Sequence, residues 1–496
     1  MRRINSTFRG RVIGSLAMAL AVGAAVASAE PPEYPRKTDG KRPALLDRLK
    51  SEVPPLKHPR GSRWPMILWE CVSFEPQPPE VYKALLDRGI TQHIRMDEKM
   101  IPTAQAIQKA GAPVIMMQGS GGPWPYDQAK SWAHEYDEGY TPKVSKSWWP
   151  SWKACPAVFE GWRVNADRIR QTLGKFKAAG VTVDAVWMDW EGEPSSSRAR
   201  EGWENARHCK RCRRLIPPSV LADYSQWGTY CSRLYTGLLA AYLAAPVREV
   251  FPRCSLTNWM LVCSTPERPV RGWGNGTVAP TVPLLMTATN PVAYGNDIFW
   301  KFWDKSWPLN RRSVDRFYMH LLVRQVSDDS ANKLAFAAEL GCVPWVARWC
   351  PDAGDPNKPM ISRGAYREAL RHIWLRGADN MQVFNASRKG HEDIVFAEVA
   401  DAVGVYDEML AYGRFLDAGT ILCCDVPDAH AEGVFWSGRR LGDEAIVRAI
   451  HQTDGDAAAK VRIEAWPGAA VEVEPPPEGA TWLLKRDGKS VRAVRQ

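Results

Sequence analysis

Apolar runs of strand length alternate with helix-like segments between residues 62 and 418. Such alternation predicts a parallel sheet covered by helices, and eight strands in this length fit a (β/α)8 barrel. The expected strands are Pro65–Phe74, Thr91–Met96, Ala112–Gln118, Val181–Glu191, Cys254–Met260, Val282–Thr289, Cys342–Arg348 and Ala378–Asn385. The expected helices are Pro79–Arg88, Thr103–Ala110, Trp162–Ala179, Ser219–Val250, Val314–Gln325, Arg363–Arg376 and Phe396–Leu416.

The pattern changes on both sides of this region. Residues 419–496 show short segments with a period of two, separated by Gly, Pro and Asp, which predicts a small antiparallel, β-sandwich-like domain. Residues 30–61 are rich in Pro and Lys with little periodicity, and we expect an extended leader there. A doubly wound open sheet is the alternative to the barrel, but no Gly-rich nucleotide fingerprint follows any expected strand.

The first 29 residues have the pattern of a secretory signal peptide. Four arginines precede an apolar run from Val12 to Val26, and Ala27-Ser28-Ala29 provides a small-residue cleavage site. The alternative, a retained membrane anchor, is disfavoured because the run is shorter than the ~20 residues that a span requires. We therefore expect an exported protein, periplasmic or secreted, with no membrane span after cleavage.

Composition excludes one class of partner and suggests another. The formal charge of +10 includes the four arginines of the signal and shows no long basic run, so nucleic-acid binding is not expected. Twenty-three tryptophans are many for this length, and a number of them fall in expected loops. An indole offers a flat apolar face and an N–H donor, which suits stacking on sugar rings, although core packing would explain part of the set.

The fourth expected strand ends in a group of acids. Its sequence is Val186-Trp187-Met188-Asp189-Trp190-Glu191-Gly192-Glu193-Pro194. Side chains in a strand alternate faces, so Trp187, Asp189 and Glu191 are expected on one face. Mutual repulsion raises the pKa of at least one of two neighbouring carboxyls, which suits a general acid for glycosidic bond cleavage. The alternative is an N-cap or salt-bridge role for this pair in the loop, and Glu193 is a further catalytic candidate.

Polar or aromatic residues also close other expected strands or follow them. In barrel enzymes the catalytic groups lie at the carboxyl ends of the strands, so convergence of these residues predicts a sugar-binding cleft. The expected substrate-binding residues are Glu70, Asp97, Gln118, Trp124, Trp187, Trp190, Asn258, Trp345, Trp349 and Asn385.

The Asp-Trp-Glu of residues 189–191 resembles the motif that closes the fourth barrel strand in hyaluronidases and, as Asp-x-Glu, in chitinase-type barrels. The resemblance implies that Glu191 is the general acid. It implies that Asp189 steadies a substrate N-acetyl group, which acts as the internal nucleophile. These families also use a Tyr near the sixth strand, for which Tyr294 is the candidate.

A second resemblance competes with the first. Residues 184–195 are similar to the Trp-x-Asp-Met-Asn-Glu-Pro-Ser motif of family 31 α-glycosidases, with one inserted residue. This similarity implies that Asp189 is the nucleophile and Asp297 the acid. The order Gly295-Asn296-Asp297 departs from the Gly-Asp-Asn of that family. Both resemblances cover about a dozen residues and share a glycoside hydrolase barrel with Asp189 in its site.

Other classes remain open. A non-catalytic carbohydrate-binding barrel would have the same fold and tryptophans without turnover. No organic cofactor is required, and no paired-His metal motif occurs on any expected strand. Cys209 and Cys212 form a Cys-x-x-Cys that is a weak candidate for a metal, because a zinc knuckle needs two more ligands and Cys231 is the only obvious one nearby. A loop-stapling disulfide or free thiols are the alternatives.

Overall fold

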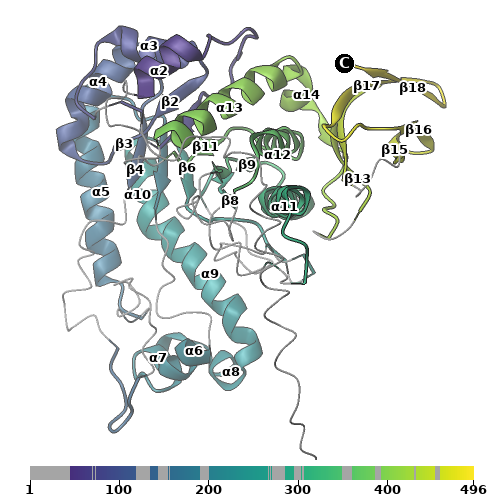
Figure 1. Cartoon of the computed structure of the whole chain (residues 1–496). Helices are drawn as coiled ribbons and strands as arrows, with labels where there is room; N and C mark the ends of the chain where they lie inside the picture. Colours follow the sequence, from purple (N-terminus) through teal and green to yellow (C-terminus); the bar gives the residue numbers. More distant parts are fainter. Residues whose placement is uncertain are drawn as a thin grey trace, which may run out of the picture.

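The computed structural model describes residues 45–69, 71–72, 74–118, 134–142, 155, 157–189, 200–265, 267–268, 270, 285–294, 303, 306–348, 360–385, 392–428, 432–452 and 459–496. Within these ranges the chain has an α/β region followed by antiparallel β structure (Figure 1). The expected signal peptide lies outside the described residues. No described helix combines the length and the apolar character needed to span a membrane.

The α/β region is built on short parallel strands. They are β1 (Met66–Leu68), β2 (Ile90–Gln92), β3 (Ile94–Arg95), β4 (Ile115–Gln118), β5 (Ala185–Met188), β6 (Ser255–Asn258), β7 (Ala288–Thr289), β8 (Val292–Tyr294), β9 (Gly341–Cys342), β10 (Trp345–Ala347) and β11 (Gln382–Val383). They pair in three sheets, in the orders β2-β1-β11-β10-β8, β3-β4-β5-β6 and β7-β9, and every pairing is parallel.

Three strand positions are each divided in two. His93 separates β2 from β3, Pro291 precedes β8, and Pro344 precedes β10. Proline has no N–H to donate to a ladder, which accounts for two of the interruptions. Between β6 and β7 no ladder forms among the described residues, and the Thr287 N–H donates to Leu256 O at 2.9 Å.

Helices lie outside the strands and follow the expected alternation. They are α3 (Pro79–Leu86), α4 (Ile101–Lys109), α5 (Glu160–Ala178), α9 (Trp227–Leu239), η6 (Ala240–Ala244), α10 (Ala245–Val250), α11 (Arg311–Phe336), α12 (Arg363–Leu375), α13 (Glu392–Leu410) and α14 (Gly413–Ala418). Three short helices, α6 (Arg200–Arg207), α7 (Cys212–Leu215) and α8 (Pro218–Ala222), form a group at the far end of α9 (Figure 1).

The alternation of side chains along β5 divides the core. Val186 and Met188 pack with Leu173 and Phe176 of α5 in one apolar cluster. Trp187 belongs to a different cluster, which contains Trp345 of β10. The strand is therefore covered on both faces, as is usual for parallel sheets.

The expectation of an extended leader at residues 30–61 is wrong for its second half. Helix α2 (Leu45–Glu52) forms there, and Leu46, Leu49 and Val53 are buried. Their spacing of three and four residues is that of a helical face, which outweighs the surrounding prolines and lysines. The carbonyls of Leu49 and Val53 accept hydrogen bonds from buried Arg88, which fixes α2 to the end of α3.

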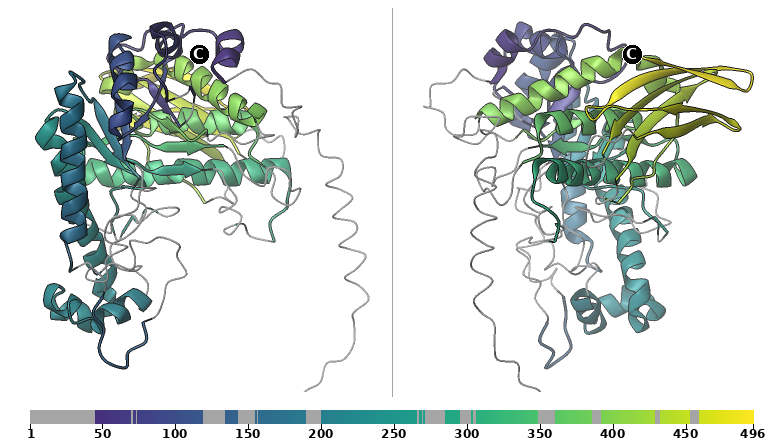
Figure 2. Two further views of the ribbon diagram at one scale, coloured as in Figure 1. Left: turned by 90° about the vertical axis from the view of Figure 1, so that its left-hand side faces the viewer. Right: turned by 45° about the vertical axis from the view of Figure 1, so that its right-hand side comes forward.

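Residues from 420 onward form antiparallel sheets, as expected. One sheet has the order β12 (Thr420–Ile421), β13 (Val434–Leu441), β14 (Glu444–His451), β17 (Ala480–Asp487) and β18 (Ser490–Arg495). The hairpin of β15 (Val461–Trp466) and β16 (Ala469–Val473) forms the second. Gly442 and Gly488 have φ of +59°, which the tight turns between β13 and β14 and between β17 and β18 require. Figure 2 shows these strands projecting to one side of the helices.

Buried arginines join this β region to α12. The guanidinium of Arg448 in β14 donates to both carboxylate oxygens of Glu368, each at 2.6 Å. Arg376 donates to the hydroxyls of Ser437 and Ser327, and Arg439 donates to carbonyls of Leu416 and Trp374. We call these contacts the arginine junction.

Candidate active site

Aromatic side chains from several of the parallel strands, or from residues next to them, pack against one another. Trp69 follows β1, and its ring centroid lies 5.1 Å from His93, 5.8 Å from Trp187, 5.5 Å from Trp345 and 5.2 Å from Phe384. Trp259 and Tyr294 extend the group, because Trp259 lies 5.3 Å from Trp345 and Tyr294 lies 5.2 Å from Phe384. We call these seven residues the aromatic floor.

The floor has a buried layer and a half-buried layer. Trp187 and Trp345 expose only 2% and 1% of their surface, whereas Trp69 and Phe384 are half-buried. The sequence suggested Trp187 and Trp345 as sugar-binding residues, but both rings are almost fully buried. Trp69 and Phe384 were missed, although each precedes a polar strand-end residue, Glu70 or Asn385, and so occupies the adjacent position.

His93 is a buried titratable group inside the floor. Burial, assisted by the positive charge of Arg95, lowers the pKa of His93 to about 3. The imidazole is therefore neutral at physiological pH. It packs edge-on against Trp69 and Trp187, so it contributes to the floor as an aromatic ring rather than as an acid.

Asp189 directly follows β5 and extends its pairing with β4. Its N–H donates to Gln118 O at 3.0 Å, and the residue is half-buried. Because side chains alternate along a strand, Asp189 shares the face of Trp187, which belongs to the floor. The strand itself ends at Met188, three residues before the expected Glu191. A carboxylate is thus placed at the carboxyl end of the fourth strand position, next to the aromatic floor.

Several expected site residues lie outside the described residues. They are Glu70, Trp124, Trp190, Glu191, Glu193, Asp297 and Trp349. All follow carboxyl ends of parallel strands in the sequence, so their assignment to the site remains a prediction.

Two expected substrate-binding residues face the helices. The Gln118 amide donates to Asn165 Oδ1 of α5 at 3.4 Å, and the Asn258 amide donates to the Tyr235 hydroxyl of α9 at 3.0 Å. Both pair in register with Met188 of β5, whose side chain also packs toward α5. The amides of Gln118 and Asn258 therefore contact α5 and α9, and a role for them in substrate binding stays a prediction.

The other described candidates have structural contacts. Asp97 is exposed and caps η1 (Glu98–Met100) by accepting the Lys99 N–H at 3.0 Å. Asn385 is buried and accepts the Trp69 N–H at 2.8 Å, which links β1 to β11 and holds Trp69 in place. Tyr294 is a buried member of the floor. Of these three, Asn385 and Tyr294 belong to the site by position, and Asp97 lies apart from the floor's ring contacts.

A cavity of about 320 Å³ lies toward the amino-terminal ends of the strands. Its lining includes the first residues of several strands, such as Ile115, Ser255 and Gln382. Trp187 forms part of its wall. Catalytic groups of barrel enzymes occupy the carboxyl ends of the strands. We therefore place the candidate site on the side of the floor nearest those ends, and not in this cavity.

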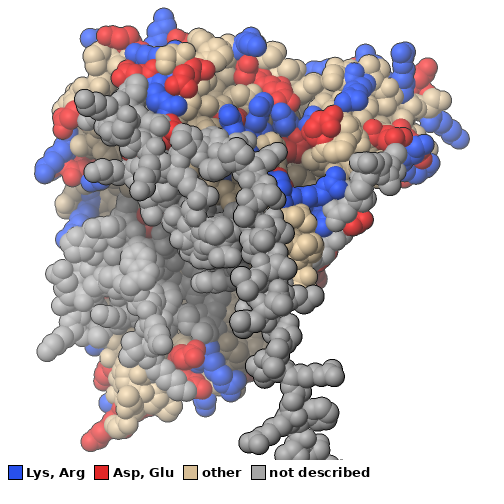
Figure 3. Space-filling model, in the orientation of Figure 1, with Lys and Arg blue, Asp and Glu red and all other residues tan. Residues whose placement is uncertain are grey.

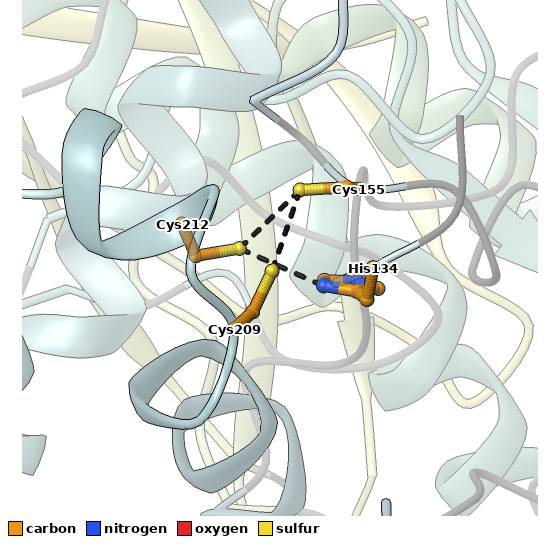
Figure 4. Close-up of side chains that lie close together, drawn as sticks. All are labelled: His134, Cys155, Cys209 and Cys212. Carbon is orange, nitrogen blue, oxygen red and sulfur yellow. Dashed lines mark hydrogen bonds between the residues drawn. The ribbon is translucent and has the colours of Figure 1, made fainter. Parts of the chain in front are cut away.

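Cys209 and Cys212 lie with two residues that sequence reasoning missed. Cys155 and His134 complete a group of four side chains whose ligand atoms all lie within 4.8 Å of one another, as Figure 4 shows. The Cys231 expected from the sequence is not part of this group. Hydrogen bonds from Cys155 and Cys212 lower the pKa of Cys209. The ten described cysteines form no disulfide with one another.

The surface around these features carries mixed charge. On the described part of the face in Figure 3, basic and acidic side chains are interspersed over the upper helices and the C-terminal strands. Such a surface offers no large basic area for a polyanion.

No protein-family model matches the chain, and no curated protein matches it. Among solved structures, a β-galactosidase from Halorubrum lacusprofundi aligns with a TM-score of 0.44 and 13% identity, over 70% of this chain and 58% of that one. An α-L-fucosidase from Paenibacillus thiaminolyticus gives 0.40 and 9%, over 70% of this chain and 49% of that one. An Anoxybacillus α-amylase gives 0.38 and 12%, over 95% and 93%.

The alignments thus span about half the length of the first two of these proteins. All three neighbours are glycoside hydrolases. At these TM-scores the likeness leaves the assignment of an activity to the residues of this chain itself.

Proposed function

We propose that this protein is an exported glycoside hydrolase that cleaves a poly- or oligosaccharide by carboxylate general acid catalysis. The observation that carries the proposal is the position of Asp189. It places a carboxylate at the carboxyl end of β5, on the face of Trp187 and next to the aromatic floor. In the Asp-Trp-Glu sequence Glu191 comes two residues after Asp189, so continued strand alternation would put both side chains on the same face.

The fold that best accommodates this site is a (β/α)8 barrel. The described strands pair in three separate parallel sheets, and a barrel would join them in the order β1, β2/β3, β4, β5, β6, β7/β8, β9/β10 and β11, which pairs with β1. The Thr287–Leu256 hydrogen bond supplies the step between β6 and β7, where the described strands form no ladder. A barrel would direct every strand's carboxyl end toward the floor.

In the proposed mechanism Glu191 protonates the glycosidic oxygen. The negative charge of Asp189 nearby would raise the pKa of Glu191, which keeps it protonated until the bond breaks. Asp189 would either orient an N-acetyl group that attacks the anomeric carbon or attack that carbon directly. Substrates with and without N-acetyl groups separate these two roles.

The aromatic floor supports a sugar ligand. Trp69 and Phe384 are half-buried and present apolar faces of the kind on which sugar rings stack. Below them, the buried indole N–H groups of Trp187 and Trp345 have no acceptor in the part of the chain that the structure describes. An unpaired buried donor costs ~1–3 kcal/mol, so a water molecule or a ligand hydroxyl that accepts from these N–H groups would stabilise the aromatic floor.

A carbohydrate-binding barrel without turnover is the second candidate. The specific observation in its favour is that Gln118 and Asn258 contact helices. Fewer polar side chains therefore lie at the aromatic floor than the sequence suggested. Such a protein would bind a glycan and leave it intact.

The deciding experiment measures reducing-sugar release from a panel of N-acetylated polymers, α-glucans and β-glucans. The wild-type protein is compared with Glu191→Gln and Asp189→Asn, and with Asp167→Asn as a control for a carboxylate on the outer helix α5. We expect both site variants to lose at least ~100-fold in activity and the control to retain it. Wild-type binding without sugar release would favour the binding barrel, and full activity of Glu191→Gln would contradict the proposed acid.

A further inference from the structure

The four ligand atoms described above come from two separate excursions of the chain. His134 and Cys155 belong to the segment between β4 and α5, and Cys209 and Cys212 belong to the segment between β5 and α9 (Figure 4). We propose that His134, Cys155, Cys209 and Cys212 bind one zinc ion that joins these two segments. We call this group the thiol cluster. The proposal is independent of the proposed function.

The spacing of the ligand atoms fits a metal tetrahedron. Zinc–sulfur bonds of about 2.3 Å at tetrahedral angles place two sulfurs about 3.8 Å apart, and a zinc–nitrogen bond of about 2.0–2.1 Å places nitrogen about 3.6 Å from sulfur. Cys155 Sγ lies 3.8 Å from Cys209 Sγ and 3.6 Å from Cys212 Sγ. His134 Nδ1 lies 3.6 Å from Cys212 Sγ. These three edges match the expected ones, and all the ligand atoms lie within 4.8 Å of one another.

The number of thiols argues against a disulfide. Three sulfurs meet at this point, and any pair that oxidised would leave the third beside it as a buried thiol. Three thiolates and one imidazole form a Cys3His set, which zinc binds with four protein ligands and no open position. The site is therefore structural rather than catalytic. Lys210 and Arg211, between the two cysteines of the Cys-x-x-Cys, both lie near Glu135.

The surrounding backbone already brackets the site. Tyr136 and Cys209 form an antiparallel bridge, the Lys210 N–H donates to Glu135 O at 2.8 Å, and the Asp137 N–H donates to His208 O at 2.9 Å. These bonds bring together segments about seventy residues apart. Arg213 also donates to both carboxylate oxygens of Asp137 at 2.7 Å, and the metal would add His134 and Cys155 to this framework.

The helices next to the cluster need such support. Around the cysteines, α6–α8 and the start of α9 share one small apolar group that includes Trp203, Ile216, Val220 and Trp227. A core of this size rarely stabilises a unit by itself, and small units commonly rely on a metal. Because β4 and β5 are neighbours, the proposed zinc would also tie together two segments that follow strands of the candidate site.

Metal analysis of the purified full chain tests the proposal. We expect about one zinc per chain by mass spectrometry of the metal content. Cys212→Ser and Cys155→Ser should each lower the zinc content at least tenfold. Cys231→Ser is the matched control, because this buried thiol lies in the same apolar group but not among the ligands, and it should leave the zinc content unchanged.

A second measurement covers the case in which the ligand variants fail to fold. Wild-type protein is titrated with a mercurial in the presence of a zinc-sensitive dye, and zinc should be released as the cluster thiols react. Replacement by Co²⁺ should give the sulfur-to-metal absorption of thiolate ligation. A chain without metal, a disulfide found between any two of the three cysteines, or loss of zinc in Cys231→Ser would each overturn the proposal.

Discussion

The arginine junction and the thiol cluster solve the same problem with opposite chemistry. Each holds together parts of the chain that are far apart in the sequence through buried polar groups. At the junction every named guanidinium has acceptors at hand, and Arg448 meets both oxygens of Glu368. At the cluster the ligand atoms of three cysteines and one histidine converge. The junction is complete as it stands, whereas the cluster is complete only with a cation.

This difference predicts different responses to perturbation. Breaking the junction leaves a charge buried without its partner, and such losses cost about 3–5 kcal/mol. Removing the ion from the cluster takes away a contribution that reaches about 10–16 kcal/mol in small zinc units. The effect at the cluster should stay local, since it involves short helices at the far end of α9.

The largest expected effect is that of metal removal. A strong chelator should open α6–α8 and increase the rate of proteolysis at residues 200–226 at least tenfold. The β14–β17 pairing should keep its protection in hydrogen exchange, because the junction uses no metal. Peptide mapping of the cleaved protein checks this. Equal loss of protection in both regions would show that they unfold as one unit, and the comparison would fail.

Next in size is the loss of the buried carboxylate. Glu368→Gln should destabilise the protein by about 3–5 kcal/mol, because Arg448 and Arg371 would face an uncharged amide. Urea denaturation followed by circular dichroism measures this. Glu249→Gln is the control, since Glu249 pairs with Arg170 at the surface and its loss should leave the midpoint nearly unchanged. A shift as small as the control's would mean that the junction contributes little.

Acid should weaken the junction through the same residue. Burial raises the pKa of Glu368, but the interactions with His372 and Arg448 outweigh burial and leave its pKa lowered to about 2. A lowered folded-state pKa stabilises the fold fully above the unfolded value of 4.5, and this contribution is lost as pH falls from 4.5 toward 2. The urea midpoint should therefore drop over this range in wild type and drop less in Glu368→Gln. Parallel pH profiles would contradict this assignment.

The smallest effect is expected from crowding the ion pair. A Cβ at Gly479 would lie 2.7 Å from both Arg448 Nη2 and Glu368 Oε1, and the residue has φ of +75°. Gly479→Ala should cost about 2 kcal/mol, combining backbone strain with displacement of the pair. Gly468→Ala, at φ of +72° with no atom near its Cβ, shows the strain alone. Equal losses in the two variants would show that the pair gives way freely.

Much of the frame follows from local sequence. Apolar runs bounded by turns located the parallel strands, because such strands are buried on both faces and read as continuous hydrophobic segments. The same property hides which residues face inward. Gln118 and Asn258 were therefore assigned to the cleft, although they contact α5 and α9.

The ligands of the thiol cluster show a second limit. Cys209 and Cys212 were noticeable because they are three residues apart, but Cys155 lies 54 residues before Cys209. The pairing of β4 with β5 and the bridge between Tyr136 and Cys209 bring their following segments together. A local search around the Cys-x-x-Cys suggested Cys231 instead. Helix α2 was missed for another reason, since its helical spacing of apolar residues is short and set among prolines.

The aromatic floor also gives the protein an optical property. Ring centroids of Trp187 and Trp345 are 4.9 Å apart, and Trp69 and Trp259 lie within 6 Å of that pair. Indoles held this close, at fixed angles, couple their electronic transitions and should dominate the near-ultraviolet circular dichroism. This signal depends on fixed packing and disappears when packing is lost while helices persist. Binding of a ligand to Trp69 would therefore change the near-ultraviolet circular dichroism spectrum, so binding could be followed without a label.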